Sequence, residues 1–176
     1  MPKYFNYYPK IYYDAVGDGN PKVVTNILRR VKLKNGLKDS LSLFDEVEVQ
    51  NGETPEIMSE QIYGDQQYYW VILLFNNIKD RFYDWPLDNV QFEQYVNDKY
   101  SNPNGVHHYE IDQESGDTTS SDNSHKIQVS SGTSGATSVT NYEYEQREQL
   151  KKRTIRLLKP EFLNLFVNEF TSLMGS

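Results

Sequence analysis

The sequence has 176 residues and contains no cysteine, so disulfide bonds and thiolate metal sites are excluded. Basic residues are in the minority, and the formal net charge of -7 argues against general nucleic-acid binding. No apolar run approaches the ~20 residues that a membrane-spanning helix needs. The longest run, residues 68–75, is better read as a buried helix. The amino terminus also lacks the apolar core of a signal peptide, so we expect the chain to be made and folded in the cytoplasm.

The sequence also lacks the motifs of common catalytic sites. It has no phosphate-binding loop, no nucleophile elbow and no His-Glu-x-x-His pair. His107 and His108 are adjacent and would point to opposite sides of a strand, and His125 is the only other histidine. Asp14 and the Asp18-Gly19-Asn20 group resemble a calcium loop only faintly, and a plain turn is the better interpretation. We expect no catalytic residues, no cofactor and no metal ion.

Aromatic residues, by contrast, are abundant, with 14 tyrosines, eight phenylalanines and two tryptophans. Many of them lie in residues 1–40, where no helical or strand period is evident. Tyrosine combines an apolar ring with a polar tip and is enriched at protein interfaces. We therefore interpret residues 1–40 as an N-terminal arm that docks on a partner, and we expect that deleting residues 1–13 abolishes docking but leaves the fold of residues 41–100 intact. Its candidate interface residues are Tyr4, Phe5, Tyr7, Tyr8 and Tyr12.

Residues 41–100 carry the clearest local signals. Thr54 and Pro55 predict a helix start, Gly64 predicts its end, and Asp65 can cap a second helix through residues 68–75. Residues 44–49 alternate as a strand, and residues 78–87 would return as its partner strand or as a turn. This strand–helix–helix–strand order resembles a LysM module, a small unit that binds glycans or protein surfaces.

Three side chains of the second helix, Trp70, Leu73 and Leu74, are expected to be largely buried. Trp85, which precedes Pro86, is the more open of the two tryptophans and is another candidate contact residue. A further helix is predicted over residues 90–100.

Residues 101–141 are rich in serine, threonine and glycine, with strand-like segments at 108–111 and 126–130. They predict a hairpin or flap whose outer part, residues 114–124, is mobile. Residues 142–176 predict a charged helix, an extended segment at 154–159 and a final helix with an apolar stripe. The end of the charged helix and the start of the extended segment carry the basic residues Lys151, Lys152, Arg153 and Arg156. These form either a docking strip for an acidic partner or a solvated face, and the two readings have equal weight.

The series as a whole resembles the baseplate wedge subunit (gene product 53) of T4-like contractile-tail phages. The blocks that carry this resemblance are Pro9-x-Ile11-x-Tyr13-Asp14, Thr25-Asn26-Ile27-Leu28, Gly52-Glu53-Thr54-Pro55, Tyr63-Gly64-Asp65, Asn76-Asn77-Ile78-x-Asp80, Asp84-Trp85-Pro86-Leu87 and Lys151-Lys152-Arg153-x-Ile155. The resemblance implies an α+β fold with a small LysM-like βααβ module. Around the module it places an N-terminal arm, a Ser/Thr-rich hairpin or flap, and C-terminal helices.

The resemblance also implies a non-enzymatic structural subunit of the virion tail, assembled in the host cytoplasm. Such a subunit clamps the central helical bundle of the wedge and links neighbouring wedges around the hub. Its partners would be other wedge proteins, with hub or tail-tube proteins as further partners, in several copies per sixfold baseplate. We expect neither self-association of the isolated chain nor binding to nucleic acid or membrane. The alternative is a LysM-type binder of peptidoglycan or chitin.

Overall fold

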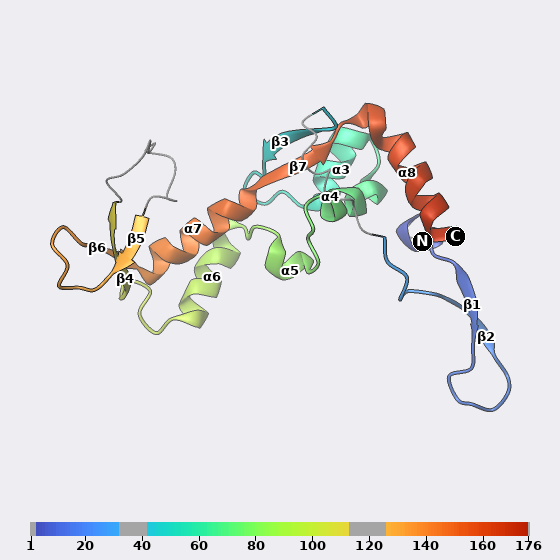
Figure 1. The fold of residues 1–176 in the computed structure, drawn as a ribbon, viewed down its shortest axis with the longest axis horizontal. Helices are drawn as coiled ribbons and strands as arrows, with labels where there is room; N and C mark the ends of the chain where they lie inside the picture. The colour runs from blue at the N-terminus through green and yellow to red at the C-terminus, as the bar shows by residue number, and fades with distance from the viewer. Residues whose placement is uncertain (1–2, 32–41, 113–125, 176) are drawn as a thin grey trace. The chain divides into compact units, whose positions relative to one another are not determined.

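The computed structural model describes residues 3–31, 42–112 and 126–175. The mixture of helices and strands confirms the α+β class (Figure 1). The chain forms two compact units. We call residues 1–85 with 154–176 the split unit and residues 86–153 the inserted unit, and each is described by itself.

The paired helices of the split unit start and stop at the predicted residues. Helix α3 (Pro55–Tyr63) begins after Thr54, whose hydroxyl oxygen accepts a hydrogen bond from the Ile57 N–H at 3.3 Å. It ends at Gly64, whose φ of 70° is in the left-handed region that favours glycine. Asp65 then caps the 3₁₀ turn η1 (Gln66–Tyr68), which leads into α4 (Tyr69–Phe75). These local predictions are confirmed.

The strand of residues 44–49 is also present, but its partner differs from the one expected. Strand β3 (Phe44–Glu48) pairs antiparallel with β7 (Thr154–Leu158), so that Phe44 lies opposite Leu158. The expectation of a return strand within residues 78–87 is wrong, because that segment holds the short helix α5 (Arg81–Asp84). Asp80 caps this helix by accepting the Phe82 N–H at 2.8 Å.

Asn76 explains how strand β7 is held beside the helices. Its side-chain amide donates to the carbonyl oxygen of Arg156 at 2.8 Å, and its amide oxygen accepts the Arg156 N–H at 2.8 Å. The side chain thus provides the two hydrogen bonds that a neighbouring strand would provide. The end of α4 is thereby tied to a strand that is remote in the sequence.

Two apolar clusters form the core of the split unit. The first joins α4 to the last helix, α8 (Pro160–Gly175), through Trp70, Val71, Phe75, Leu158, Leu163, Phe170 and Met174. The second consists of Val49, Met58, Ile72, Trp85, Ile155 and Leu157. Trp70 is buried as predicted, whereas Leu73 and Leu74 are only partly buried, and Val71 and Ile72 are the fully enclosed residues of α4. The final helix has its predicted apolar stripe, although Leu173 on that stripe is exposed.

The N-terminal arm has more regular structure than its sequence predicts. Residues Lys3–Asn6 form the short helix α1, and β1 (Lys10–Tyr13) pairs antiparallel with β2 (Lys22–Thr25). The connecting turn is organised by Asp14, whose carboxylate accepts the N–H groups of Gly17 at 2.7 Å and Gly19 at 2.9 Å. These hydrogen bonds lower the pKa of Asp14. The carboxylate therefore acts as a cap for the turn.

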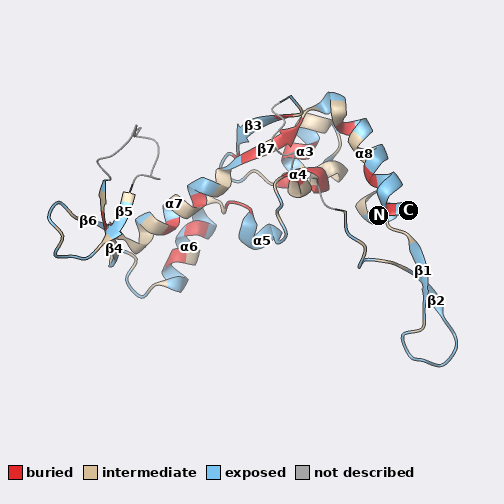
Figure 2. Ribbon diagram, in the orientation of Figure 1, coloured by how far each residue is buried: buried red, intermediate tan, exposed pale blue. Residues whose placement is uncertain are grey.

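The inserted unit combines a three-stranded sheet with two helices. Its central strand β4 (Val106–Asp112) lies between β5 (Lys126–Val129) and β6 (Thr137–Thr140), with α6 (Asn89–Lys99) before the sheet and α7 (Asn141–Arg153) after it. The predicted helices and the β4–β5 pair are confirmed, whereas β6 was not predicted. Phe92 and Val96 on α6 and Val139 on β6 are buried in the inserted unit. Figure 2 shows the buried stretches of α6 in red.

The outer part of the Ser/Thr-rich segment, residues 114–124, lies outside the described residues. Strands β4 and β5 already pair up to Asp112 opposite Lys126. Replacing residues 114–124 by a short Gly-Ser linker is expected to leave the thermal midpoint unchanged within error, because loop-closure entropy changes by only ~0.6 kcal/mol per doubling of length. Thermal unfolding followed by circular dichroism tests this, and a large drop would show that the segment packs into the protein.

Candidate functional site

The aromatic residues of the arm divide into an inward and an outward group. Tyr4 and Tyr7 lie against Trp70, with ring centroids 5.4 and 5.6 Å from the indole, and Tyr7 also contacts Phe170 at 5.9 Å. The Tyr8 hydroxyl donates to the Tyr4 hydroxyl, and burial together with this hydrogen bond raises the pKa of Tyr8. These three tyrosines therefore anchor the amino terminus on the chain's own core.

The outward group presents apolar surface on the β1–β2 hairpin and beside it. Phe5 is 48% exposed and Tyr12 is 78% exposed, so these two predicted interface residues have open rings. The structure adds hairpin residues that the sequence reasoning did not single out as contacts, namely Tyr13, Val16 and Val23 at 57%, 84% and 59% exposed. Tyr13 and Val23 belong to short runs of aromatic and β-branched residues, which was a usable signal for strands, whereas Val16 lies in the turn between them.

Trp85 lies in the core of the split unit. It is 6% exposed, and its indole N–H donates to the Glu53 carbonyl oxygen at 2.8 Å. Trp70 is 3% exposed. Neither indole therefore offers an open face on which a sugar ring could stack.

The basic residues fall into two settings. Lys151, Lys152 and Arg153 form the last turn of α7, where positive charge is favourable at a helix C-terminus. Lys151 pairs with Glu148 at 2.5 Å, and its side chain is 69% exposed. Arg156 belongs to β7 instead, where its Nε lies 3.2 Å from Glu46 on β3 and its guanidinium lies over the Phe44 ring. Arg156 thus has a cross-strand acidic partner, and the helix end is the more open part of the strip.

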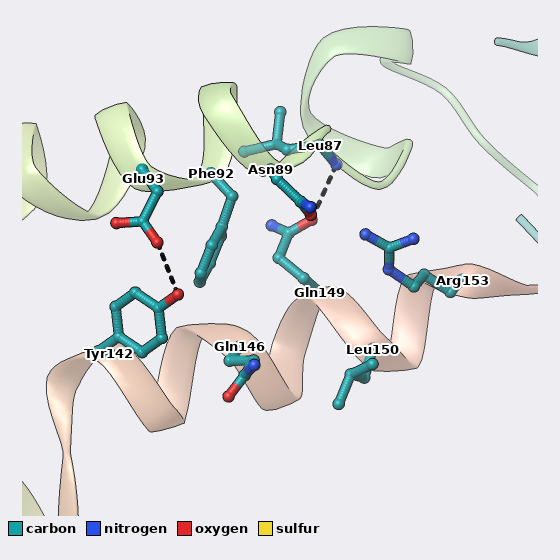
Figure 3. Close-up of a pocket in the computed structure, with 9 residues that line it drawn as sticks. All are labelled: Leu87, Asn89, Phe92, Glu93, Tyr142, Gln146, Gln149, Leu150 and Arg153. Atoms are coloured by element: carbon teal, nitrogen blue, oxygen red, sulfur yellow. Dashed lines mark hydrogen bonds between the residues drawn. The ribbon is translucent and has the colours of Figure 1, made fainter. Parts of the chain in front are cut away.

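Helices α6 and α7 flank a partly open cavity of about 310 Å³ within the inserted unit (Figure 3). The Tyr142 hydroxyl donates to Glu93 at 2.7 Å beside it, and the Gln149 side-chain oxygen accepts the Leu87 N–H at 3.0 Å. The remaining lining residues are Asn89, Phe92, Gln146, Leu150 and Arg153. The lining thus combines apolar side chains with polar and charged ones.

A buried carboxylate organises the sheet of the inserted unit. Glu110 on β4 is 4% exposed and accepts two hydrogen bonds from Arg147 on α7, at 2.8 and 3.1 Å. Lys126 on β5 lies 3.2 Å away. The hydrogen bonds from Arg147 lower the pKa of Glu110 against the opposing effect of burial. The group thus links a strand, its neighbour and a helix, and its role is structural.

Glu110→Gln is expected to destabilise the inserted unit by about 1–3 kcal/mol at neutral pH, because hydrogen bonds to charged groups are lost. Since the folded pKa of Glu110 is lowered, its contribution is present above the unfolded pKa of ~4.3 and is lost as the pH falls through the folded pKa. The difference between variant and wild type should therefore shrink in acid. Hydrogen exchange of β4 and α7 peptides at several pH values measures the stability difference between variant and wild type. A difference that does not change with pH would contradict the stabilising role of the Glu110 carboxylate.

The two adjacent histidines lie on the same side of the strand, not on opposite sides. A bulge interrupts the β4–β6 register between Val106 and His108, which re-aims one side chain. As a result, the Nδ1 atoms of His107 and His108 lie 2.8 Å apart, and the His107 ring stacks on Tyr144 at 3.9 Å. Over residues 3–31, 42–112 and 126–175, no group of three or more histidine, aspartate or glutamate residues is placed to hold a metal ion.

None of the helices in the described residues has both the length and the apolar character needed to cross a membrane.

No curated protein matches the sequence. A family model does match it: the model for base plate wedge protein 53 covers residues 3–118. The match includes the hairpin, the paired helices and the first helix and strand of the inserted unit. Because the matched residues make up more than half of the chain, this protein belongs to the base plate wedge protein 53 family and is a structural component of a phage tail baseplate.

Proposed function

We propose that the chain is a non-enzymatic subunit that clamps the core bundle of a baseplate wedge and links neighbouring wedges around the hub, after assembly in the host cytoplasm. The observation that carries the proposal is the family match over residues 3–118. Its partners would be other wedge proteins and hub or tail-tube proteins, in several copies per sixfold baseplate.

The division of the chain into two units supports a linking role. Each unit has its own buried residues, and each carries a separate candidate contact surface. In the split unit this surface is the β1–β2 hairpin, and in the inserted unit it is the α6–α7 cavity with the basic end of α7. Two separate surfaces would let one subunit hold two partners at once. We retain residues 1–40, 41–100, 101–141 and 142–176 as the proposed functional segments. The LysM-like module of segment 41–100 is completed by β7 from segment 142–176, which pairs with β3.

Cross-linking mass spectrometry of purified tails, read together with a density map of the baseplate, tests this proposal. We expect peptides of the split unit and of the inserted unit to be linked to proteins of two adjacent wedges. Cross-links that the density map assigns to the proteins of one wedge only would contradict the linking role. Absence of the chain from purified tails would contradict the structural role itself.

The basic end of α7 provides a charge-dependent test. Lys151→Glu is expected to weaken incorporation several-fold at low salt, and the effect should decrease at high salt because ions screen exposed charges. Lys79→Glu, which makes the same charge change at an exposed residue of the split unit, is the matched control. Equal behaviour of the two variants would favour the solvated-face reading of the strip.

Glycan binding remains the second candidate function, because the elements β3, α3, α4 and β7 follow the strand–helix–helix–strand order of a LysM module. The burial of Trp70 and Trp85 supports a protein-binding scaffold instead. Co-sedimentation with purified peptidoglycan separates the two. Retention of the chain in the pellet, lost on competition with soluble muropeptides, would favour glycan binding.

A further inference from the structure

The β1–β2 hairpin exposes apolar side chains on both of its faces. Tyr12 and Val23 lie opposite each other on one face, 78% and 59% exposed. Ile11 lies opposite Val24 on the other face, each 36% exposed, and Tyr13 lies beside them. None of the eight strand residues is buried, as Figure 2 shows along both strands.

An antiparallel pair of strands normally buries one face on its own protein and turns polar residues outward on the other. A hairpin that buries neither face is only marginally stable in water. This ribbon therefore needs a covering surface. Because both faces are apolar, a partner on one face alone would leave the rings or aliphatic groups of the other in water.

The tip of the hairpin has a different character. Residues 14–21 contain Asp14 and Asp18 and no lysine or arginine. Val16 at the tip is 84% exposed. The turn has a fixed shape, since Asp14 accepts N–H groups of the turn and Asp18 accepts the Asn20 N–H at 2.9 Å. The hairpin thus presents a pre-shaped end with two aspartates, on a stem whose only charged residues are Lys10 and Lys22.

We propose that this hairpin is inserted between two protein surfaces of the assembled baseplate. The hairpin would occupy a cleft that other baseplate subunits form. The cleft has apolar walls on both sides, and lysine or arginine lies at the end that receives the acidic tip. The proposal rests on the proposed function as a wedge subunit. It adds that the β1–β2 hairpin, covered on both faces, is the contact through which other baseplate subunits hold the split unit.

Photo-cross-linking in assembled tails tests the two-sided insertion. A photoreactive phenylalanine analogue is placed at Tyr12 for one face, at Val24 for the other and at Val16 for the tip. We expect irradiated tails to contain cross-links from both faces to different baseplate peptides, and a tip cross-link to a peptide that contains lysine or arginine.

Cross-links from one face alone would overturn the proposal, as would cross-links to a second copy of this chain. If the modified chain is present in purified tails but forms no cross-link from any of the three positions, the proposal is also overturned. Absence of the unmodified chain from purified tails would instead overturn the proposed function, so the two failures are distinguishable.

The charge of the tip is tested separately. Asp18→Asn keeps an acceptor for the Asn20 N–H and removes the charge, whereas Asp18→Lys reverses the charge. In competition with wild type during tail assembly, Asp18→Lys is expected to incorporate at least about tenfold less well, with Asp18→Asn between the two, because like charges across an interface are strongly unfavourable. Equal incorporation of all three chains would show that the receiving surface is not basic.

Discussion

Replacing Trp70 by alanine is expected to lower the free energy of unfolding of the split unit by about 3–5 kcal/mol, as for other buried tryptophan truncations. The ring is 3% exposed and packs against Tyr4, Tyr7, Phe166 and Phe170, the last at 4.5 Å between centroids. No small residue beside it can fill the space that the ring would leave, because these neighbours are themselves large. The truncation should therefore create a cavity and release the N-terminal tyrosines.

Trp70→Phe is the matched control. The indole N–H of Trp70 is buried and has no hydrogen-bond partner among the described residues, so phenylalanine removes no polar contact that the structure shows. It keeps an aromatic ring against Phe170 and should cost clearly less than alanine.

Both tryptophans belong to the split unit, so urea unfolding followed through Trp85 fluorescence reports on that unit in either variant. A loss below about 1 kcal/mol for Trp70→Ala would show that the α4–α8 cluster is not central to stability.

The same contacts change how the N-terminal arm should be dissected. Residues 1–13 were expected to be removable without effect on the fold of residues 41–100. Tyr4 and Tyr7 now contribute ring contacts to Trp70 and Phe170, so deleting them would also strip the core. A deletion that separates docking from folding must keep α1 and remove only the hairpin.

Local signals predicted local structure well, because each depends on a few neighbouring residues. Thr54, Gly64 and Asp65 fix helix ends through their own hydrogen bonds and backbone geometry. The pairing of β3 with β7 could not be predicted in the same way, since the whole inserted unit lies between the two strands in the sequence. Nothing in residues 44–48 alone distinguishes a partner at 78–87 from one at 154–158, and the choice is made by burial of Ile155, Leu157 and Leu158 in the core.

The sequence predicted that residues 1–40 carry contact residues, but it did not predict which aromatic rings pack on the core and which stay exposed. Although no period is evident over residues 1–40 as a whole, Tyr4, Tyr7 and Tyr8 by themselves have the i, i+3, i+4 spacing of a helix face, which was a missed signal for the inward packing. Tyr12 and Tyr13 are adjacent and follow strand alternation, which places them on opposite faces. The bulge that brings His107 and His108 together depends on the register with β6 and leaves no local trace.

Removing the hairpin is expected to abolish incorporation of the chain into tails while leaving the split unit folded. The hairpin can be excised cleanly because Pro9 and Asn26 are already neighbours, with the Asn26 N–H donating to the Pro9 carbonyl oxygen at 2.9 Å. An Asn-Gly turn in place of residues 10–25 suits such a closure. The excision removes no buried side chain, since none of the strand residues is buried, and it retains Tyr4, Tyr7 and Tyr8 on the core.

Tryptophan fluorescence, which reports on the split unit because Trp70 and Trp85 both belong to it, and circular dichroism should therefore give a thermal midpoint close to that of wild type. Tails assembled in the presence of the shortened chain should lack it. Tyr12→Ser combined with Val23→Ser, which makes one face of the ribbon polar and keeps its backbone, should reduce incorporation but to a smaller extent, because the second face can still be covered. If the shortened chain were found in tails at the wild-type level, the hairpin would not be the contact that holds the split unit. The exposed residues of the inserted unit, with the α6–α7 cavity and the basic end of α7, would then have to provide the attachment by themselves.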